Sequence, residues 1–447
     1  MLRGIKSTRV VSPDGVGPAT VVVRGERIEE VLRGDSGLPA SALEDVGQQV
    51  VTAGLVDCHV HINEPGRTEW EGFASATRAA AAGGVTTLVD MPLNSLPVTT
   101  DASALAQKLE ASEHQRYVDV GFWGGVVPGN ALHLSELAKA GVLGCKAFMV
   151  HSGIDEFPNS TRADLARAMP ILRDAGLPLL AHAELDLGAH VTEPDPRVYR
   201  GYLQSRPNAW EDQAIELLVE LCRETRCAVH IVHLSSASSL ETLRRAKDEG
   251  LPISAETCPH YLCLEAESIP DGATEFKCAP PIREHDNREA LWRGLFEGVI
   301  DFVVTDHSPC SPALKRQDLG DFAQAWGGIA SLSLGLSTLW TEGLRRGATL
   351  VQLSHWLSER PARFAGLKGT KGKLQRGYDA DIVIWDPEAS FEVAPNDLYF
   401  RHKLTPYFAR TLQGRVHSTM LRGQRVFDGT HHPAGPVGRT LLHRTAP

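Results

Sequence analysis

The amino-acid sequence predicts an α/β protein, a (β/α)8 TIM barrel joined to a small β-sandwich domain that the two ends of the chain form together. Two patterns carry this prediction. From Val51 to about Leu367, short apolar runs alternate with helical stretches, as in repeated strand–helix units. Before and after this region, short strands follow one another with turn residues between them. The predicted parts are 1–52 and 368–447 for the small β domain and tail, and 53–367 for the barrel.

The small β domain is predicted from strand and turn signals at both ends of the sequence. Pro13-Asp14-Gly15 and Gly25-Glu26 are turn residues between apolar runs. Because both ends show the same pattern, we expect them to pair into one domain, and we expect the tail after Gly429 to be loosely held. The expected strands are 10–12, 19–23, 27–32 and 381–385, followed by a strand–turn–strand unit at 418–427.

The barrel is predicted from eight successive strand–helix units. The pattern alone also fits an open, doubly wound sheet, and the count favours the closed barrel. In a closed barrel the active site lies at the C-terminal ends of the strands. The expected strands are 54–61, 86–92, 118–126, 144–150, 178–184, 228–234, 252–260 and 300–307. The helices between them include 71–82, 101–115, 208–225, 236–249 and 328–346.

Composition narrows the class of protein. The net charge of −10 lacks the basic footprint of a nucleic-acid-binding protein. The eight cysteines include no C-x-x-C pair, which argues against a disulfide framework or a thiolate zinc site. The first residues carry charges and no long apolar run, so we expect neither a signal peptide nor a membrane span. We therefore expect a cytoplasmic protein without nucleic-acid or membrane partners.

Two histidines end the first barrel strand. His59 and His61 are two residues apart, so both side chains are expected to face the barrel axis while Cys58 and Val60 face the helices. Two neutral imidazoles at one strand end suit zinc or a similar transition metal. An H-x-H pair alone is a weak signal, and the alternative is a pair of partly buried polar residues.

Further ligand-type side chains end later strands. His182 ends the fifth strand, and Asp306 follows the apolar run of the eighth. An unpaired carboxylate is costly there, so Asp306 predicts a partner cation. His230 and His233 flank the end of the sixth strand at an odd separation, which predicts opposite orientations. We expect only His233, nearer the C-terminal mouth, to be a ligand.

Lys146 ends the fourth apolar strand, where a bare ammonium is also costly. One interpretation is a lysine paired with an acid. The sharper interpretation is that the amine has reacted with carbon dioxide, which turns a cation into a carboxylate-like bridge. Four neutral histidines, Asp306, this carbamate and a hydroxide would leave two divalent metal ions with about one net positive charge, which is far easier to bury than bare ions.

This ligand set resembles that of the amidohydrolase superfamily, specifically its cyclic-amide branch of dihydroorotases, hydantoinases and allantoinases. The resemblance covers nearly the whole chain, and Gly377–Asp381 looks like the usual re-entry into the split β domain. It implies two divalent metal ions, with zinc favoured, and a homotetramer. The implied metal ligands are His59, His61, Lys146 as carbamate, His182, His233 and Asp306.

Within the branch the sequence resembles the allantoinases. The most telling stretches are Arg67–Phe73 and the Asp321-Phe322…Ala325–Ile329 segment. Dihydroorotases usually have an arginine that binds the substrate carboxylate at the position of Asn63. The neutral amide of Asn63 instead suits a substrate without a carboxylate, a neutral ring with a ureido tail. The other resembling stretches are 91–95, 152–157, 258–262, 277–283 and 306–310.

The resemblance implies hydrolysis of the hydantoin ring of allantoin to allantoate, with Asp306 as general base and then general acid. Hydantoinases usually have a tyrosine, whose hydroxyl contacts the ring carbonyl, at the position of His151. We therefore expect His151 or Ser152 to donate a hydrogen bond to the oxyanion in this chain. Asn63, Asn94 and Ser308 are further expected substrate contacts. The alternatives are a hydantoinase- or dihydropyrimidinase-like cyclic amidase, and a scaffold protein of the same fold.

Overall fold

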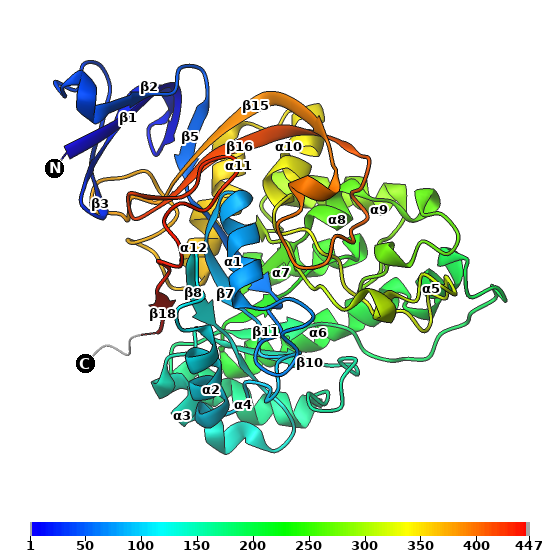
Figure 1. Cartoon of the computed structure of the whole chain (residues 1–447). Coiled ribbons are helices and arrows are strands. Elements are labelled where there is room, and N and C mark those ends of the chain that lie inside the picture. The colour runs from blue at the N-terminus through cyan, green and yellow to red at the C-terminus, as the bar shows by residue number, and fades with distance from the viewer. Residues whose placement is uncertain (1, 444–447) are drawn as a thin grey trace.

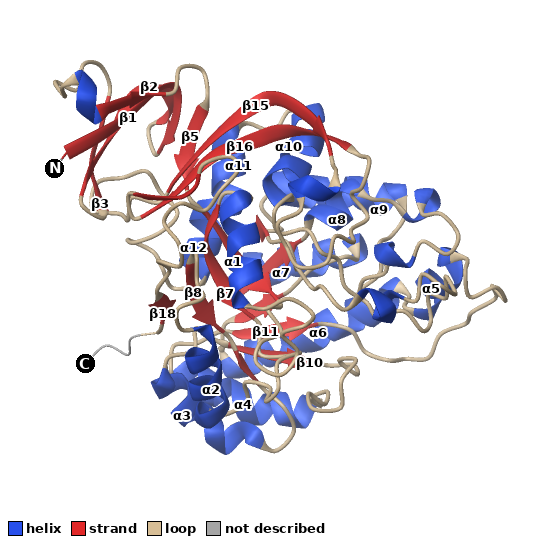
Figure 2. Cartoon of the chain, in the orientation of Figure 1, coloured by secondary structure: helices blue, strands red, loops and turns tan. Residues whose placement is uncertain are grey.

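The computed structural model describes residues 2–443 and has the predicted α/β fold, with a ring of parallel strands beside a small β domain (Figures 1 and 2). The ring consists of two arcs of parallel strands. One arc has the order β8-β7-β6 and the other the order β14-β13-β12-β11-β10-β9. The strands are β6 (Leu55–Val60), β7 (Val85–Asp90), β8 (Asp119–Phe122), β9 (Gly124–Gly125), β10 (Cys145–Phe148), β11 (Leu179–His182), β12 (Val229–Ile231), β13 (Ile253–Thr257) and β14 (Phe302–Val303).

The two arcs meet at both ends. Only Trp123 separates β8 from β9; its N–H donates to the carbonyl of Asp90, and the next N–H, of Gly124, donates to the carbonyl of Gly144. At the other junction the N–H of His61 donates to the carbonyl of His307 over 2.8 Å, and Val60 forms a parallel bridge with His307. The strands therefore surround a common axis, and their C-terminal ends lie at one mouth.

Helices cover the outside of this ring. They are α1 (Phe73–Ala82), α2 (Ala102–Ser112), α3 (Leu134–Ala140), α4 (Arg162–Asp174), α5 (Tyr199–Ser205), α6 (Asn208–Thr225), α7 (Leu240–Asp248), α8 (Pro259–Cys263), α9 (His285–Phe296), α10 (Gly335–Arg345), α11 (Leu350–Ser354) and α12 (Arg360–Phe364). No helix among residues 2–443 is long and apolar enough to span a membrane.

Among the predicted elements whose bounds differ from the structure, two have a clear physical reason. The predicted strand 252–260 ends at Thr257, because Pro259 opens α8. The predicted helix 328–346 starts only at Gly335. The residues before it are extended because Ile329 pairs with His307 and accepts a hydrogen bond from the N–H of Ser308. This extended segment forms part of the mouth of the barrel.

The two ends of the chain share one sheet, as predicted, in the order β17-β16-β15-β5-β1-β2-β3, with β4 paired to β1. Val21, Val51 and Ile384 come from three different strands and belong to one buried cluster, so the sheet encloses a core of its own. Its strands are β1 (Leu2–Ser12), β2 (Gly15–Arg24), β3 (Arg27–Leu32), β4 (Leu43–Asp45), β5 (Val50–Ala53), β15 (Ile382–Glu392), β16 (Thr411–Leu421) and β17 (Gln424–Phe427).

The expectation of a loosely held tail after Gly429 is wrong for the described residues up to 443. The short strand β18 (Thr440–Leu441) pairs in parallel with β8. The N–H of Arg439 donates to the carboxylate of Asp119 over 2.7 Å. Asp119 is buried, and its carboxylate also contacts Lys371 and Arg422. The buried carboxylate of Asp119, which contacts several basic residues, thus holds in place a tail whose composition had suggested mobility.

Candidate metal centre and substrate cavity

Four predicted ligands converge at the mouth of the barrel. Nε2 of His59 lies 3.2 Å from Oδ1 of Asp306, and Nε2 of His61 lies 3.6 Å from the same oxygen. Nζ of Lys146, in β10, lies 3.1 Å from Nε2 of His59. These side chains are buried. The first, fourth and eighth strands therefore bring their polar ends to one point.

The remaining two predicted ligands form a second group beside the first. Nδ1 of His182 lies 2.9 Å from Nε2 of His233. The rings of His59 and His233 are 5.3 Å apart, so the two groups adjoin. Ligand atoms of His59, His233 and Asp306 all lie within 4.8 Å of one another.

The donor set fits divalent metal ions. With zinc–nitrogen bonds near 2.0–2.1 Å, two ligands on one tetrahedral ion lie about 3.3 Å apart, close to the spacings between these donor atoms. Burial, the largest cause, and the neighbouring Lys146 hold the pKa of His59 and of His61 well below the ordinary value. Both imidazoles are therefore neutral near pH 7, as metal binding requires.

Burial also shifts the two charged groups of the centre. It raises the pKa of Asp306 to about 8, against the opposing charge of Lys146. It lowers the pKa of Lys146 to about 8, against the opposing charges of Asp306 and Glu256. With a pKa of about 8, Asp306 in isolation would be mostly protonated near pH 7, and Lys146 would have a larger fraction of neutral amine than an ordinary lysine. Cations at this point would favour the ionised carboxylate.

Buried carboxylates orient two of the histidines. Oε1 of Glu256 lies 2.5 Å from Nδ1 of His59, and Oε2 of Glu184 lies 2.6 Å from Nε2 of His182. Such contacts fix the tautomer and the orientation of a metal-binding imidazole. Arg206 in turn donates to both oxygens of Glu184. The roles of Glu256 and Arg206 were not predicted from the sequence.

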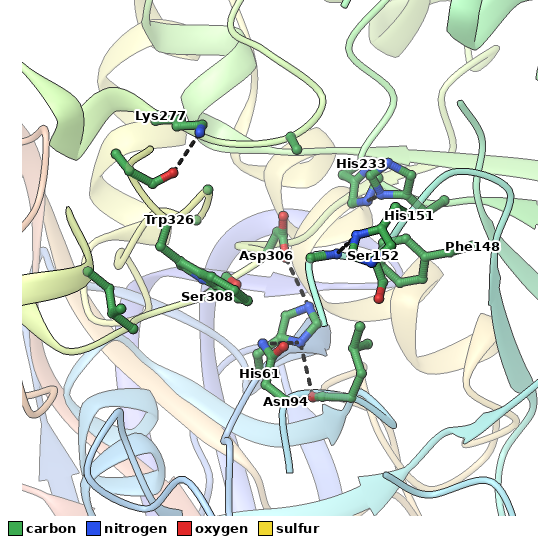
Figure 3. Close-up of a pocket in the computed structure, with 18 of the residues that line it drawn as sticks. His61, Asn94, Phe148, His151, Ser152, His233, Lys277, Asp306, Ser308 and Trp326 are labelled. Carbon is green, nitrogen blue, oxygen red and sulfur yellow. Dashed lines mark hydrogen bonds and ion pairs between the residues drawn. The ribbon is translucent and has the colours of Figure 1, made fainter. Parts of the chain in front are cut away.

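A cavity of about 290 Å³ opens beside this centre (Figure 3). Four of the five predicted substrate contacts line it: Asn94, His151, Ser152 and Ser308. Asn63 does not line it; its amide donates to the carbonyl of Pro309 over 3.2 Å and its side chain is buried. Lining residues that the sequence analysis did not anticipate include Tyr202, Arg206, Lys277, Gln324 and Trp326.

The predicted oxyanion donors already have partners. The hydroxyl of Ser152 lies 2.6 Å from the carbonyl of Phe157 and 3.0 Å from that of Ile154. Nε2 of His151 lies 3.4 Å from Asp155, and the His151 side chain is 61% exposed. In this conformation neither group is a free donor to a carbonyl at the metal ligands.

Known proteins match this chain over most of its length. The model of the amidohydrolase family matches residues 50–426. The chain belongs to the amidohydrolase family. Residues 50–426 take in all the barrel strands and each of the converging side chains.

Relatives of this amidohydrolase cover nearly its whole length. An allantoinase of Streptomyces avermitilis is 49% identical over 98% of each chain. An allantoinase of Arabidopsis thaliana is 45% identical, covering 99% of this chain and 91% of the relative. An allantoinase of Saccharomyces cerevisiae is 44% identical over 99% of each chain.

Solved structures agree with this fold. An L-hydantoinase (dihydropyrimidinase) of Arthrobacter aurescens superimposes with a TM-score of 0.91 at 27% identity, over 99% of this chain and 100% of that one. A dihydropyrimidinase of Brevibacillus agri gives a TM-score of 0.89 at 26% identity over the whole of both chains. The barrel with its split β domain is therefore the fold of this amidohydrolase.

In this amidohydrolase the predicted opposite orientation of His230 and His233 is wrong. Nε2 of His230 lies 3.1 Å from Oε2 of Glu256, so His230 also points into the barrel, below the cavity. Strand β12 ends at Ile231, and His233 has a φ of 40°. Alternation of sides holds only while the strand continues, and a left-handed residue turns the chain.

Proposed function

We propose that this amidohydrolase is an allantoinase, which hydrolyses the hydantoin ring of allantoin to allantoate in purine degradation. The observation that carries the proposal is the set of allantoinases from bacteria, plants and yeast that match nearly the whole chain at 44–49% identity. The convergence of six ligand-type side chains at a cavity supports it.

We propose that His59, His61, Lys146 as carbamate, His182, His233 and Asp306 hold two divalent ions, with zinc favoured by the imidazole donors. When bound, such ions polarise a carbonyl and lower the pKa of a bound water to about 7. Lys146 suits carbamate formation because burial favours its neutral amine, the form that reacts with carbon dioxide. Lys146 also has no carboxylate within ion-pair distance among the described residues, unlike Lys108, which pairs with Asp90.

Asp306 is the proton carrier in this proposal. Its carboxylate lines the cavity, next to the histidine nitrogens. It accepts the proton that the attacking water loses and returns that proton to the ring nitrogen as the amide bond breaks. One carboxylate serves as base and then as acid because the proton it accepts is the one it returns.

The two stretches most typical of allantoinases meet beside the cavity. The rings of Trp70 and Trp326 pack edge to face at 4.9 Å, and the guanidinium of Arg67 lies 5.3 Å from the centre of the Trp70 ring. Arg67 also donates to the carbonyl of Asn94, which lines the cavity. The stretch that contains Trp326 therefore lines the cavity, and the stretch that contains Arg67 and Trp70 packs behind it.

Hydantoinase activity is the second candidate, supported by the hydantoinase structures that share the fold. A panel of allantoin, hydantoin, dihydrouracil and dihydroorotate, offered to zinc-loaded protein, separates the two. We expect allantoin to give the highest kcat/KM. Faster turnover of plain hydantoin or dihydroorotate would contradict the proposal. The homotetramer and the cytoplasmic location stay predictions.

A further inference from the structure

Two cationic side chains that are not predicted metal ligands line the cavity, and one of them, Arg206, contacts Glu184, the partner of His182. Arg206 follows α5, and Lys277 follows the short turn Thr274–Phe276. Both line the cavity, whose only lining carboxylate among the described residues is Asp306. Figure 3 shows Lys277 on the far side of Asp306 from His61 and Asn94.

The charge of Arg206 is compensated by the buried Glu184. Burial, the largest cause, and the neighbouring cations Lys315 and Arg206 together lower the pKa of Lys277 to about 8. The ammonium lies 5.0 Å from the centre of the Tyr202 ring, and in the described chain no carboxylate lies within ion-pair distance of it. The positive charge of Lys277 is thus uncompensated on this wall, which favours a carbonyl or carboxylate oxygen.

Both cations keep hydrogen-bond donors that the protein does not use. Nζ of Lys277 donates to the carbonyls of Ala323 and Ala325, which leaves one of its three donors. Arg206 donates to Glu184 through Nε and Nη2, and Nη1 has no hydrogen-bond partner among residues 2–443. Such donors are available to a bound molecule.

We infer that Lys277 and Arg206 form the subsite that binds the carbonyl oxygen of the ureido substituent of the substrate. The inference rests on the proposed function. The scissile carbonyl must lie at Asp306 and the ligand histidines, so a substituent on the adjacent ring carbon projects away from them. Its carbonyl oxygen is a strong acceptor, and the two cations supply donors that plain hydantoin would leave unused.

The test compares the binding of allantoin with that of hydantoin, which lacks the ureido group. Calorimetry on zinc-loaded protein with Asp306→Asn in every variant measures both Kd values without turnover. We expect Lys277→Met to weaken allantoin binding about tenfold to a hundredfold, the range for one lost charge-assisted hydrogen bond, and to change hydantoin binding by less than about threefold. Lys277→Arg keeps the charge and should recover most of the loss.

Lys315→Met is the matched control. The Lys315 ammonium donates to the carbonyls of Lys277, Trp326 and Gly328, so it holds the same loop without lining the cavity. The subsite would be overturned if Lys277→Met lost affinity equally for allantoin and hydantoin. It would also be overturned if Lys315→Met showed the same selective loss of allantoin affinity, because Lys277 would then only support the loop. Equal affinity of the starting protein for both ligands would overturn it too. Failure of wild-type protein to hydrolyse allantoin would instead refute the proposed function, and the binding comparison would still decide the subsite.

Discussion

Oε1 of Glu256 lies 2.5 Å from Nδ1 of His59, and both side chains are fully buried in the barrel. This contact directs Nε2 of His59 toward Asp306 and Lys146. Glu256 also accepts from His230, so one carboxylate on β13 connects the first and sixth strands beneath the centre. The predicted ligand His59 is thus oriented from below by a carboxylate that does not line the cavity.

Glu256→Gln should weaken metal binding about 10- to 100-fold, because a ligand imidazole that loses its carboxylate partner is less basic and its ring is no longer held in one orientation. Metal titration of apo-protein, followed by elemental analysis, measures this loss. Glu241→Gln, on the exposed side of α7, is the control. Unchanged metal affinity in a folded Glu256→Gln variant would show that His59 does not depend on this contact.

Asp306→Asn should lower turnover of allantoin by about two to four orders of magnitude, the usual contribution of a general acid–base group. An amide of similar shape cannot carry the proton, whereas the other ligands remain. We therefore expect metal content to fall less than activity. The measurements are kcat and bound metal on the same sample. Near-normal kcat would refute the proton-carrying role.

Lys146→Ala should lose most of its metal and activity, and a high concentration of acetate should partly restore both by replacing the carbamate. Apo-protein given zinc should regain activity faster when bicarbonate is added. Lys108→Ala removes another fully buried lysine, one that pairs with Asp90, and should show no rescue by acetate. Full activity of Lys146→Ala together with no bicarbonate dependence would contradict the bridging role.

The pair Glu184–Arg206 predicts a pH dependence of stability. Burial raises the pKa of Glu184, but Arg206 and His182 outweigh it and bring the value to about 2, below the ordinary 4.5. The stabilisation is therefore complete above pH 4.5 and is lost as the pH falls toward 2.

Urea unfolding of metal-free wild type and Glu184→Gln at several pH values tests this dependence. The difference in the free energy of unfolding should shrink by about 1.4 kcal/mol per pH unit below pH 4.5. If the difference in the free energy of unfolding between the two proteins stays constant between about pH 5 and about pH 3, Glu184 is not held ionised.

The sequence was sufficient to predict the barrel and the strand ends that carry polar residues. His59, Lys146 and His182 lie in apolar strands, and Asp306 follows another. Such polar residues indicate a site in a parallel barrel, because the C-terminal ends of all its strands meet at one mouth. The prediction of a loosely held tail was wrong because the tail is held by its pairing with β8 and by a hydrogen bond to Asp119, and both lie more than 300 residues away in the sequence.

The supporting residues could not be predicted for a similar reason. Glu256 lies within an apolar strand, and only its contact with a histidine of another strand gives it a role. Arg206 and Lys277 lie in loops after short elements, where neither periodicity nor spacing fixes the direction of a side chain. One signal was present: a buried carboxylate in a strand predicts a partner.

The most direct test of the account is a zinc titration of apo-protein in bicarbonate buffer, with allantoin hydrolysis and bound metal measured at each point. The account predicts no turnover without metal, rising activity and a plateau at two zinc ions per chain, with allantoate as the product. Allantoin hydrolysis by metal-free protein, or two bound ions without allantoin hydrolysis, would contradict it.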